Sequence, residues 1–555
     1  QNPIWLSDAS DPIGPSDGLP NVWKPSIKHR ALTPEEIRKY YIEGFKKGAV
    51  VAKEAGFDGI EIHAVHEGYL LDQFATAAMN WRDDEFGGSV ENRLRFCKEI
   101  IDAIHESCGE DYPVLMRYSV VSKMKNWNDG ALPGEDYQEF GRDYQESIEI
   151  AQYLEKIGYA ALDVDNGTYD SWYWPHPPVY MPEYCNLKDV TFLKKHVNIP
   201  VYCAGKMANP EVCNDEIAKG NIDGVALARI LLADPDWANK AQANIKDEIK
   251  PCIGCHIGCL GRLFQGKRMG CAVNPECGSE ICYHYEKSDI QKHIVIVGGG
   301  IAGMEAALDA TKKGYLATIY EASNQLGGAF ISASAMSFKK EDKKLIQWYI
   351  NECQKAGVQF VMNTKITPEL IDSLQFDELI IATGAKARQL SNIKGLEKVK
   401  VINAKDALLH PEIVGEKVTI IGSGLTGIEM AYDMVLSGKQ VEVVEMKDSI
   451  LGMDVVCAAN GQMLQQIIKY YHIPVHLSAS IDHFEEGKVY YTQNNTQHVI
   501  ECDTIISSIG YISDNQLYDT LKDKYKDHIH LIGDSLQVSN LLGATWSAAE
   551  LIQKL

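Results

Sequence analysis

Two glycine-rich motifs, each between an apolar run and a helix-like pattern, most constrain how this 555-residue chain can fold. The first follows His293–Val297 and the second follows Val418–Ile421. In a G-x-G-x-x-G motif, the first glycine permits a tight turn, the second lets the backbone approach a pyrophosphate, and the third lets helix and strand pack closely. The motifs predict two dinucleotide-binding domains, with cofactor-binding glycines Gly298, Gly300, Gly303, Gly422, Gly424 and Gly427.

An acidic residue ends the next apolar run after each motif. Glu321 follows Thr318-Ile319-Tyr320, and Glu445 follows Val443-Val444. Both lie about twenty residues beyond their motif, where a carboxylate can bind ribose hydroxyls. A carboxylate at Glu445 would repel a 2′-phosphate, so we expect NADH rather than NADPH unless an arginine elsewhere binds that phosphate.

The first half of the chain alternates short apolar runs with helix patterns, such as Pro34–Ala55 and Glu91–Cys108. This alternation implies a parallel sheet. Five runs without a dinucleotide motif favour a TIM-type (β/α) barrel over an open sheet. The expected strands are Phe57–His63, Tyr112–Ser119, Tyr159–Asp165, Ile199–Gly205 and Gly224–Leu231. Since Gln1–Arg30 has the pattern of a loop, we expect the N-terminal strands of such a barrel to be missing from this sequence.

Two further segments resemble disulfide-reductase-like flavoproteins. Ala382-Thr383-Gly384 is similar to the segment at which the chain crosses between their domains. Leu531-Ile532-Gly533-Asp534 is similar to the segment whose aspartate binds the ribityl chain of FAD, which points to Gly533 and Asp534. The resemblance implies FAD at the first glycine motif and NAD(H) at the second.

Four of the fourteen cysteines are crowded into one short stretch between the two halves: Cys252, Cys255, Cys259 and Cys271. Four closely spaced thiolates bind either zinc or an iron-sulfur cluster. Zinc is redox-inert, whereas a [4Fe–4S] cluster can pass single electrons between two flavins. The flavin context therefore favours the cluster. Cys277 and Cys282 could compete as ligands, but we expect them to be bystanders.

The stretch from Cys252 to Pro275 closely resembles the cluster segment of 2-enoate reductases and 2,4-dienoyl-CoA reductases, the iron-sulfur branch of the old yellow enzyme family. The segments His63–Phe74 and Gly87–Arg93 resemble strings typical of that family. Trp172–Pro178 is most similar to 2-enoate reductases and to bacterial flavoenzymes that reduce steroid or bile-acid enones.

The resemblance implies an FMN inside the barrel. Arg117 matches the arginine that approaches the N1/O2 edge of the flavin, although an internal ion pair is the alternative role. The phosphate would lie at loops after the last two strands. The matching residues are Gly205, Lys206, Ala228 and Arg229, where Arg229 could instead cap a helix.

The resemblance also suggests catalytic residues. Tyr69 matches the proton donor, because a phenol with a pKa near 10 stays protonated at neutral pH. His63 and His66 could stabilise charge on a substrate carbonyl. The span from His63 to Tyr69 is one residue longer than in the simplest old yellow enzymes, so which histidine reaches the carbonyl stays open. Tyr173 and His176 are further candidates, with aromatic packing around prolines as the alternative role.

We therefore expect an NADH-dependent ene-reductase. Electrons would pass from NADH to FAD, then to the [4Fe–4S] cluster and FMN, and finally to the C=C bond of an enoate, enoyl thioester or steroid enone. One alternative is an amine dehydrogenase resembling trimethylamine dehydrogenase. The other is an electron-transfer flavoprotein module without its own substrate.

The domain limits expected from these motifs are a barrel portion over 1–250, an iron-sulfur connector over 251–290, an FAD-binding domain over 291–390 plus 500–555, and an NAD(H)-binding domain over 391–499.

A net charge of −22 disfavours nucleic acid as a partner. The sequence has no apolar run long enough for a membrane helix and no signal-peptide pattern. The scattered cysteines suggest a reducing compartment, so we expect a protein of the cytoplasm of an anaerobic bacterium. A homo-oligomer is plausible by resemblance.

Overall fold

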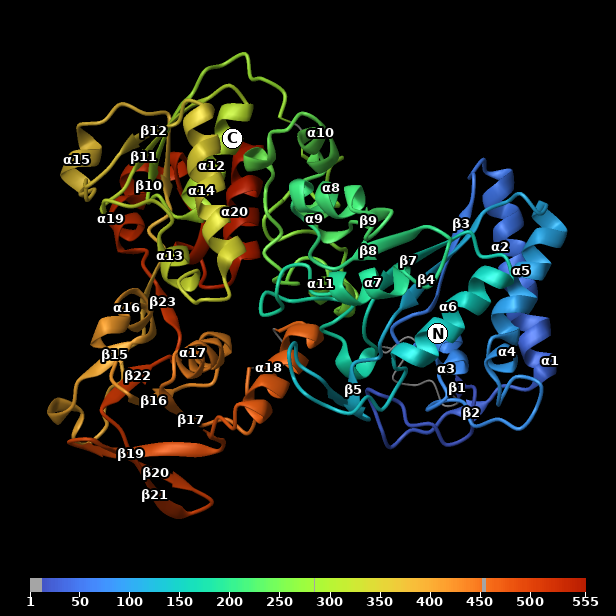
Figure 1. Cartoon of the computed structure of the whole chain (residues 1–555). Coiled ribbons are helices and arrows are strands. Elements are labelled where there is room, and N and C mark those ends of the chain that lie inside the picture. Colours follow the sequence, from blue (N-terminus) through green and yellow to red (C-terminus); the bar gives the residue numbers. More distant parts are fainter. Residues whose placement is uncertain (1–11, 284, 452–455) are drawn as a thin grey trace. The chain divides into compact units, whose positions relative to one another are not determined.

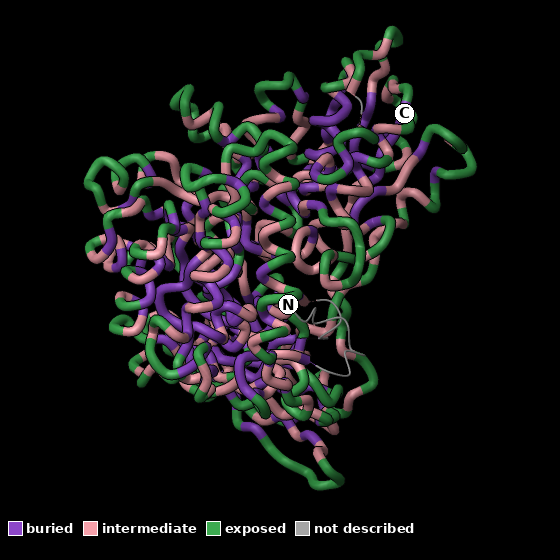
Figure 2. Tube along the Cα trace, turned by 90° about the vertical axis from the view of Figure 1, so that its right-hand side faces the viewer, coloured by how far each residue is buried: buried purple, intermediate pink, exposed green. Residues whose placement is uncertain are grey.

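The computed structural model describes residues 12–283, 285–451 and 456–555. They form two compact units, which divide after Leu227 (Figure 1). Figure 2 shows buried residues along the inner parts of the chain trace and exposed residues on its outer turns. No helix in the described residues is both long and apolar enough to cross a bilayer.

The first unit contains a five-stranded parallel sheet, and all five strands expected from the sequence are present. Their order follows the chain: β3 (Ile60–Val65), β4 (Val114–Ser119), β7 (Ala161–Asp165), β8 (Val201–Ala204) and β9 (Gly224–Ala226). Sequential parallel order with intervening helices is the arrangement of consecutive strands in a (β/α) barrel.

Helices follow the strands of this sheet in the chain and pack against it. The expected helix over Pro34–Ala55 is present, but it contains a π-helical segment: α1 (Pro34–Glu36), η1 (Ile37–Ile42) and α2 (Glu43–Glu54). Helix α5 (Arg95–Cys108) packs beside α2 and buries Ile100, Ile101 and Ile104 completely. The other helices of this layer are α3 (Leu70–Ala75), α4 (Val90–Arg93), α6 (Tyr144–Lys156), α7 (Leu187–Lys194) and α8 (Pro210–Ala218).

The second unit contains two further parallel sheets. The first has the order β12 (Gln359–Val361), β11 (Leu316–Tyr320), β10 (His293–Val297), β13 (Glu378–Ile381) and β24 (Ile529–Leu531). Successive side chains of β10 point to opposite faces. Ile294 and Ile296 therefore meet α12 (Ile301–Lys312), α14 (Lys340–Lys355) and α20 (Leu541–Lys554). Val295 and Val297 meet α15 (Pro368–Asp372) and α19 (Gln516–Tyr525).

The other parallel sheet follows the second glycine motif. Its order is β15 (Val401–Asn403), β22 (Thr504–Ser507), β16 (Lys417–Ile421), β17 (Gln440–Val444) and β18 (Val475–His476). Its helices are α16 (Ala404–Leu409), α17 (Leu425–Leu436) and α18 (Ala458–Tyr470). Because β22 pairs with β15 and β16, we now propose that this domain extends beyond residue 499, past Ser507.

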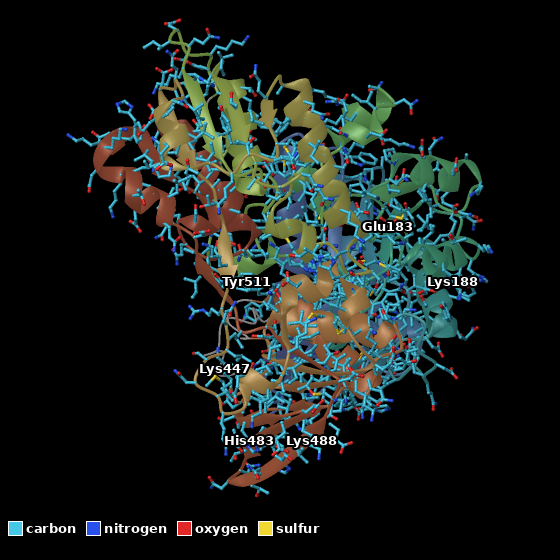
Figure 3. The ribbon with its side chains drawn as sticks, turned by 90° about the vertical axis from the view of Figure 1, so that its left-hand side faces the viewer. Glu183, Lys188, Lys447, His483, Lys488 and Tyr511 are labelled. Atoms are coloured by element: carbon cyan, nitrogen blue, oxygen red, sulfur yellow. The ribbon has the colours of Figure 1, made fainter. Side chains whose placement is uncertain are left out.

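Two smaller sheets accompany this domain. An antiparallel sheet of β19 (Ala479–Glu485), β20 (Lys488–Gln493) and β21 (Thr496–Glu501) carries His483 and Lys488 (Figure 3). Strand β14 (Ala385–Ala387) pairs antiparallel with β23 (Tyr511–Ser513), so the chain enters and leaves the domain through one two-stranded ribbon.

The connector between β9 and β10 contains α9 (Arg229–Ala233), α10 (Trp237–Gln242) and α11 (Leu260–Phe264). Helix α20 forms hydrogen bonds to the cysteine-rich part of this connector. Thr545 Oγ1 donates to the Ala272 carbonyl at 2.9 Å, and Trp546 Nε1 donates to the Cys271 carbonyl at 3.0 Å. The cysteines are thereby fixed to the domain of the first glycine motif.

Candidate functional site

Both glycine motifs have the geometry that a bound dinucleotide needs. Gly298 and Gly422 have φ of 114° and 106°, which favours glycine. Gly300 and Gly424 cap the N-termini of α12 and α17. A Cβ at Gly424 would meet no atom within 4 Å, so there is open space at a helix N-terminus, where a phosphate binds favourably. The residues present therefore fit a dinucleotide at each motif.

The third glycine of each motif allows the helix to pack against the turn. A Cβ at Gly303 would lie 2.1 Å from the Gly298 carbonyl oxygen, and one at Gly427 would lie 2.1 Å from the Gly422 carbonyl oxygen. Because both obstacles are backbone atoms, an alanine would have to push the helix away from the strand.

We expect Gly427→Ala to weaken NADH binding by about tenfold or more, since overpacking of this kind costs about 1–3 kcal/mol. The first motif is untouched, so the purified variant should keep its FAD. Anaerobic flavin reduction at increasing NADH concentration measures the change. Gly461→Ala on α18 is the control, because its Cβ would find only Leu451 at 3.9 Å. Equal NADH affinity in both variants would contradict the assignment.

The two acidic residues lie beside their motifs. Glu321 accepts a hydrogen bond from the Gly299 N–H at 2.8 Å. Glu445 accepts from the Ser423 N–H at 2.7 Å and from the N–H of Lys447 at 2.9 Å. Each carboxylate is therefore held at the end of its strand, within reach of the motif turn. Their ribose-binding role stays a prediction.

The C-terminal segment lies against the first motif helix. A Cβ at Gly533, whose φ is 59°, would lie 2.9 Å from the Cβ of Ala302 on α12. The next residue, Asp534, accepts from the Ser539 N–H at 3.0 Å, and burial raises its pKa. This places a carboxylate near the N-terminus of α12, as a flavin ribityl contact requires.

The four clustered cysteines line one small cavity in the second unit. Burial, followed by the neighbouring thiols, raises the pKa of the Cys255 thiol well above its ordinary value and that of Cys271 to about 12. Backbone N–H groups, including those of Ile257 and Val273, donate to these sulfurs and favour their thiolate form. These donors suit a buried, metal-bound thiolate cluster.

The spacing of the sulfur atoms distinguishes the two metal alternatives. In the described residues, which include all four cysteines, no three of these sulfur atoms lie within 4.8 Å of one another. Four thiolates on one tetrahedral zinc ion, each about 2.3 Å from the metal, would be about 3.8 Å apart. A cubane cluster holds its thiolates further apart, so the four thiols fit a [4Fe–4S] cluster without having to move as close together as zinc requires.

One residue near the cysteines, His256, was not predicted from the sequence. His256 is 1% exposed, and its ring bridges Arg229 Nη1 at 2.7 Å and Asn460 Oδ1 at 2.6 Å. Arg229 thus has a structural partner in the second unit. The position beside Cys255 was the only sequence signal for His256, because Asn460 is remote in sequence.

In the first unit, Arg117 on β4 forms ion pairs with Asp163 and Asp165 on β7. Burial opposes its charge, but the two carboxylates raise the pKa of Arg117 above its ordinary value. The internal ion pair considered from the sequence is therefore present. A contact of Arg117 with FMN stays a prediction. Asp163 and Asp165 are two residues apart on β7 and so share one face, which is the sequence signal that could have identified them as partners of Arg117.

A cluster of polar side chains lies where β3 ends. His63 Nε2 and His66 Nδ1 are 3.0 Å apart, and His66 Nε2 lies 2.9 Å from the Asp165 carboxylate. The Tyr69 ring packs edge-on to His63, with centroids 4.7 Å apart. Burial lowers the pKa of both histidines, and burial followed by the charge of Glu67 raises the pKa of Tyr69. The cluster therefore combines two neutral imidazoles with a protonated phenol.

Glu67 lies within the lengthened span between His63 and Tyr69, and its side chain joins the cluster. Its carboxylate accepts hydrogen bonds from Trp172 Nε1 and from His176 Nε2, the latter at 2.8 Å. Its backbone φ is 59°, a left-handed value that is uncommon outside glycine. The one-residue lengthening of this span was the sequence signal that could have identified Glu67.

The remaining sequence candidates are not all brought together. His176 reaches the cluster through Glu67, whereas Tyr173 is fully buried, and burial followed by Glu135 and Asp129 raises its pKa. Gly205 has φ of 107° directly after β8, and Lys206 Nζ donates to the Met181 carbonyl at 2.5 Å. In the second unit, Ala228 caps α9.

Residues 6–248 match the NADH:flavin oxidoreductase / NADH oxidase family, and residues 292–539 match pyridine nucleotide-disulphide oxidoreductases. Cinnamate reductase of Clostridium sporogenes is 43% identical over 98% of this chain and 81% of its own length. The chain belongs to the NADH:flavin oxidoreductase / NADH oxidase family. The clustered cysteines lie between the two matched regions.

Two other relatives agree with this membership. The NADH oxidase of Thermoanaerobacter brockii is 36% identical over 93% of this chain and 78% of its own length. The structure of 2-naphthoyl-CoA reductase superimposes with a TM-score of 0.89 at 27% identity, covering 98% of this chain and 80% of that one. The chain is thus a flavin-dependent oxidoreductase, with an FMN-binding barrel domain and domains that bind FAD and a nicotinamide nucleotide. The fold class and cofactors expected from the sequence are confirmed.

Proposed function

We propose that this enzyme uses NADH to reduce the C=C bond of an α,β-unsaturated carbonyl compound. The observation that carries the proposal is the group formed by His63, His66 and Tyr69, which offers hydrogen bonds to a carbonyl oxygen and a protonated phenol beside it. FMN, FAD and the cluster supply electron and hydride transfer when bound. The chain's own residues position the alkene and deliver a proton.

The roles follow from the chemistry of alkene reduction. Hydride addition at the β-carbon leaves negative charge on the carbonyl oxygen. The Nε2–H of His63 can stabilise this charge when it turns from His66 Nδ1 to the substrate oxygen. The α-carbon then needs a proton, and Tyr69 retains one at neutral pH because its pKa is raised. Asp165, by accepting from His66 Nε2, fixes the orientation of that ring.

We further propose an aryl-substituted enoate as the preferred substrate class. A cavity of about 70 Å³ adjoins Tyr69 and has aromatic walls that include Trp23, Trp127 and Tyr169. Flat aromatic walls favour an aryl group through offset or edge-to-face contacts. The similarity to cinnamate reductase supports the same class.

Anaerobic NADH oxidation against a panel of activated alkenes tests the function. The panel contains cinnamate, a short aliphatic enoate, an enoyl thioester and a steroid enone, with flavin and iron quantified in the same sample. We expect turnover to be fastest with cinnamate. Amine-dependent reduction of the flavin, without rapid reduction by NADH, would support an amine dehydrogenase instead.

We also propose a cytoplasmic setting, because none of the fourteen cysteines, all of which lie in the described residues, forms a disulfide. By resemblance to the family we further propose a homo-oligomer.

A further inference from the structure

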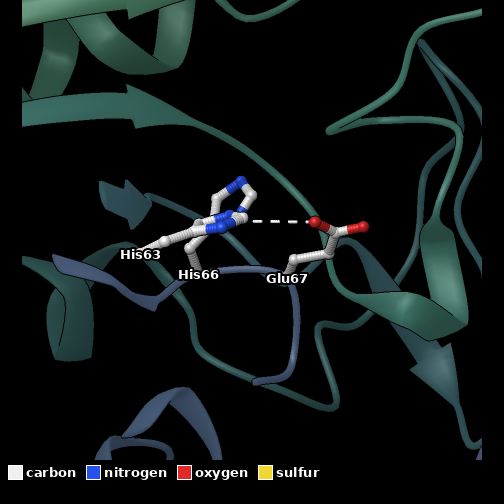
Figure 4. Close-up of side chains that lie close together, drawn as sticks. All are labelled: His63, His66 and Glu67. Carbon is white, nitrogen blue, oxygen red and sulfur yellow. Dashed lines mark hydrogen bonds and ion pairs between the residues drawn. The ribbon is translucent and has the colours of Figure 1, made fainter. Parts of the chain in front are cut away.

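Three potential metal-ligand atoms converge at the end of β3. They belong to His63, His66 and Glu67 and lie within 4.8 Å of one another (Figure 4). His63 Nε2 and His66 Nδ1 are 3.0 Å apart, and His66 Nδ1 is 3.6 Å from Glu67 Oε2. Two ligands about 2.0–2.1 Å from a tetrahedral zinc ion would be about 3.3 Å apart, so small movements would bring all three into range.

The surroundings of His66 direct a lone pair into this space. Its Nε2 lies 2.9 Å from the Asp165 carboxylate, which also accepts from Arg117. An accepting carboxylate fixes the hydrogen on Nε2 and leaves the lone pair on Nδ1. This carboxylate–imidazole arrangement is typical of histidines that bind a metal. For His63 to bind as well, its hydrogen must move from Nε2 to Nδ1.

Glu67 supplies the third atom from a constrained position. Oε1 accepts from Trp172 and His176, whereas Oε2 is buried and has no hydrogen-bond partner among the described residues. A buried carboxylate oxygen without a partner is costly, and the left-handed backbone of Glu67 adds strain. Glu67 is 1% exposed, so its carboxylate cannot turn to solvent for compensation.

The local charge favours a dication. Glu67, Asp163 and Asp165 are acidic, and Arg117 is the basic residue that both aspartates contact. If the three carboxylates are ionised, these four side chains sum to −2, with neutral His63 and His66 between them. An ion of charge +2 would therefore be attracted to this position.

We propose that His63, His66 and Glu67 form a binding site for a borderline divalent metal ion such as Zn²⁺, which leaves the fourth coordination position to water. Because His63 also stabilises the carbonyl oxygen in the proposed function, the bound ion inhibits alkene reduction by competing with the substrate. This second part rests on the proposed function, whereas the metal site itself does not.

Isothermal titration calorimetry with Zn²⁺ tests the site, using the full chain loaded with flavins and iron-sulfur cluster under anaerobic conditions. We expect one tight site, and affinity at least about 100-fold lower in His63→Ala and Glu67→Gln. Asp165→Asn should lose about 10–100-fold through the misoriented imidazole. His410→Ala is the control, since His410 is exposed and its ring bonds Glu412.

His63 lies on the edge strand β3 and is not one of the buried core residues, so its variant should fold even if Glu67→Gln does not. Unchanged zinc affinity in His63→Ala overturns the site, because the zinc then binds elsewhere, such as at the cysteines. Zinc binding that depends on His63 but does not compete with cinnamate keeps the metal site and overturns the shared carbonyl position. Binding is measured without an alkene, so a failure of the proposed function leaves the calorimetric result interpretable.

Discussion

Tyr69→Phe should slow alkene reduction by about 10²-fold or more, while NADH reduces the enzyme's flavin at the wild-type rate. The substitution removes only the hydroxyl that we propose as the proton donor. The ring contacts to His63 and Tyr169, with centroids 4.7 and 5.5 Å away, can remain. Stopped-flow flavin reduction by NADH and steady-state cinnamate turnover separate the two half-reactions.

Tyr112→Phe is the matched control, because Tyr112 is buried and its hydroxyl has no hydrogen-bond partner among the described residues. Tyr112 precedes the N-terminal end of β4, at the edge of the sheet opposite to the Tyr69 cluster. It should leave both half-reactions unchanged. If Tyr69→Phe turned over cinnamate as fast as Tyr112→Phe, the proton donor would have to be another group or a bound water.

Cys255→Ser should remove the iron-sulfur cluster and, with it, NADH-driven alkene reduction. Iron should fall from about four atoms per chain to nearly none. Burial, and then the other three thiols, raise the pKa of the Cys255 thiol, so this side chain lies among all the proposed ligands. Flavin reduction by NADH should persist, because both glycine motifs are intact.

The comparison that decides the role of the cluster is between alkene reduction driven by NADH and by dithionite in this variant. Dithionite can reduce FMN directly, without electrons from NADH. Alkene reduction driven by dithionite should survive in Cys255→Ser, unless the variant has also lost FMN, which flavin analysis detects. Cys282→Ser is the control, because Cys282 is exposed. Metal analysis that found one zinc ion per wild-type chain and no iron would contradict the cluster assignment.

The elements that follow local rules could be predicted from the sequence. The turns at Gly298 and Gly422 need glycine for reasons confined to a few residues, and both fall as expected. The five strands of the first unit are short apolar runs, and four form within their predicted ranges or within two residues of them. The fifth was predicted too long, because β9 ends at Ala226 and helix α9 begins at Arg229. The π-helical segment Ile37–Ile42 could not be predicted, because its residues are also typical of an α-helix.

Features that depend on distant pairing were not predictable in the same way. Strand β22 joins the second sheet through β15 and β16, about ninety to one hundred residues earlier in the chain, and no local pattern indicates this partner. For the same reason the bonds from Asp165 to His66 and from His176 to Glu67 emerge only in the fold. Sequence patterns identified most of the candidate side chains but not which of them share hydrogen bonds.

The ribbon of β14 and β23 has a consequence for how this protein could be altered. Ala385 pairs with Ser513, Ala387 pairs with Tyr511, and the Arg388 N–H donates to the Gly510 carbonyl at 2.9 Å. Because the two strands pair side by side, residues 388–510 leave and re-enter the rest of the unit at one place. We therefore expect this segment to be exchangeable as a unit for a homologous domain with a different nicotinamide preference, provided that its bonds to the rest of the chain, such as that of Asn460 to His256, are kept.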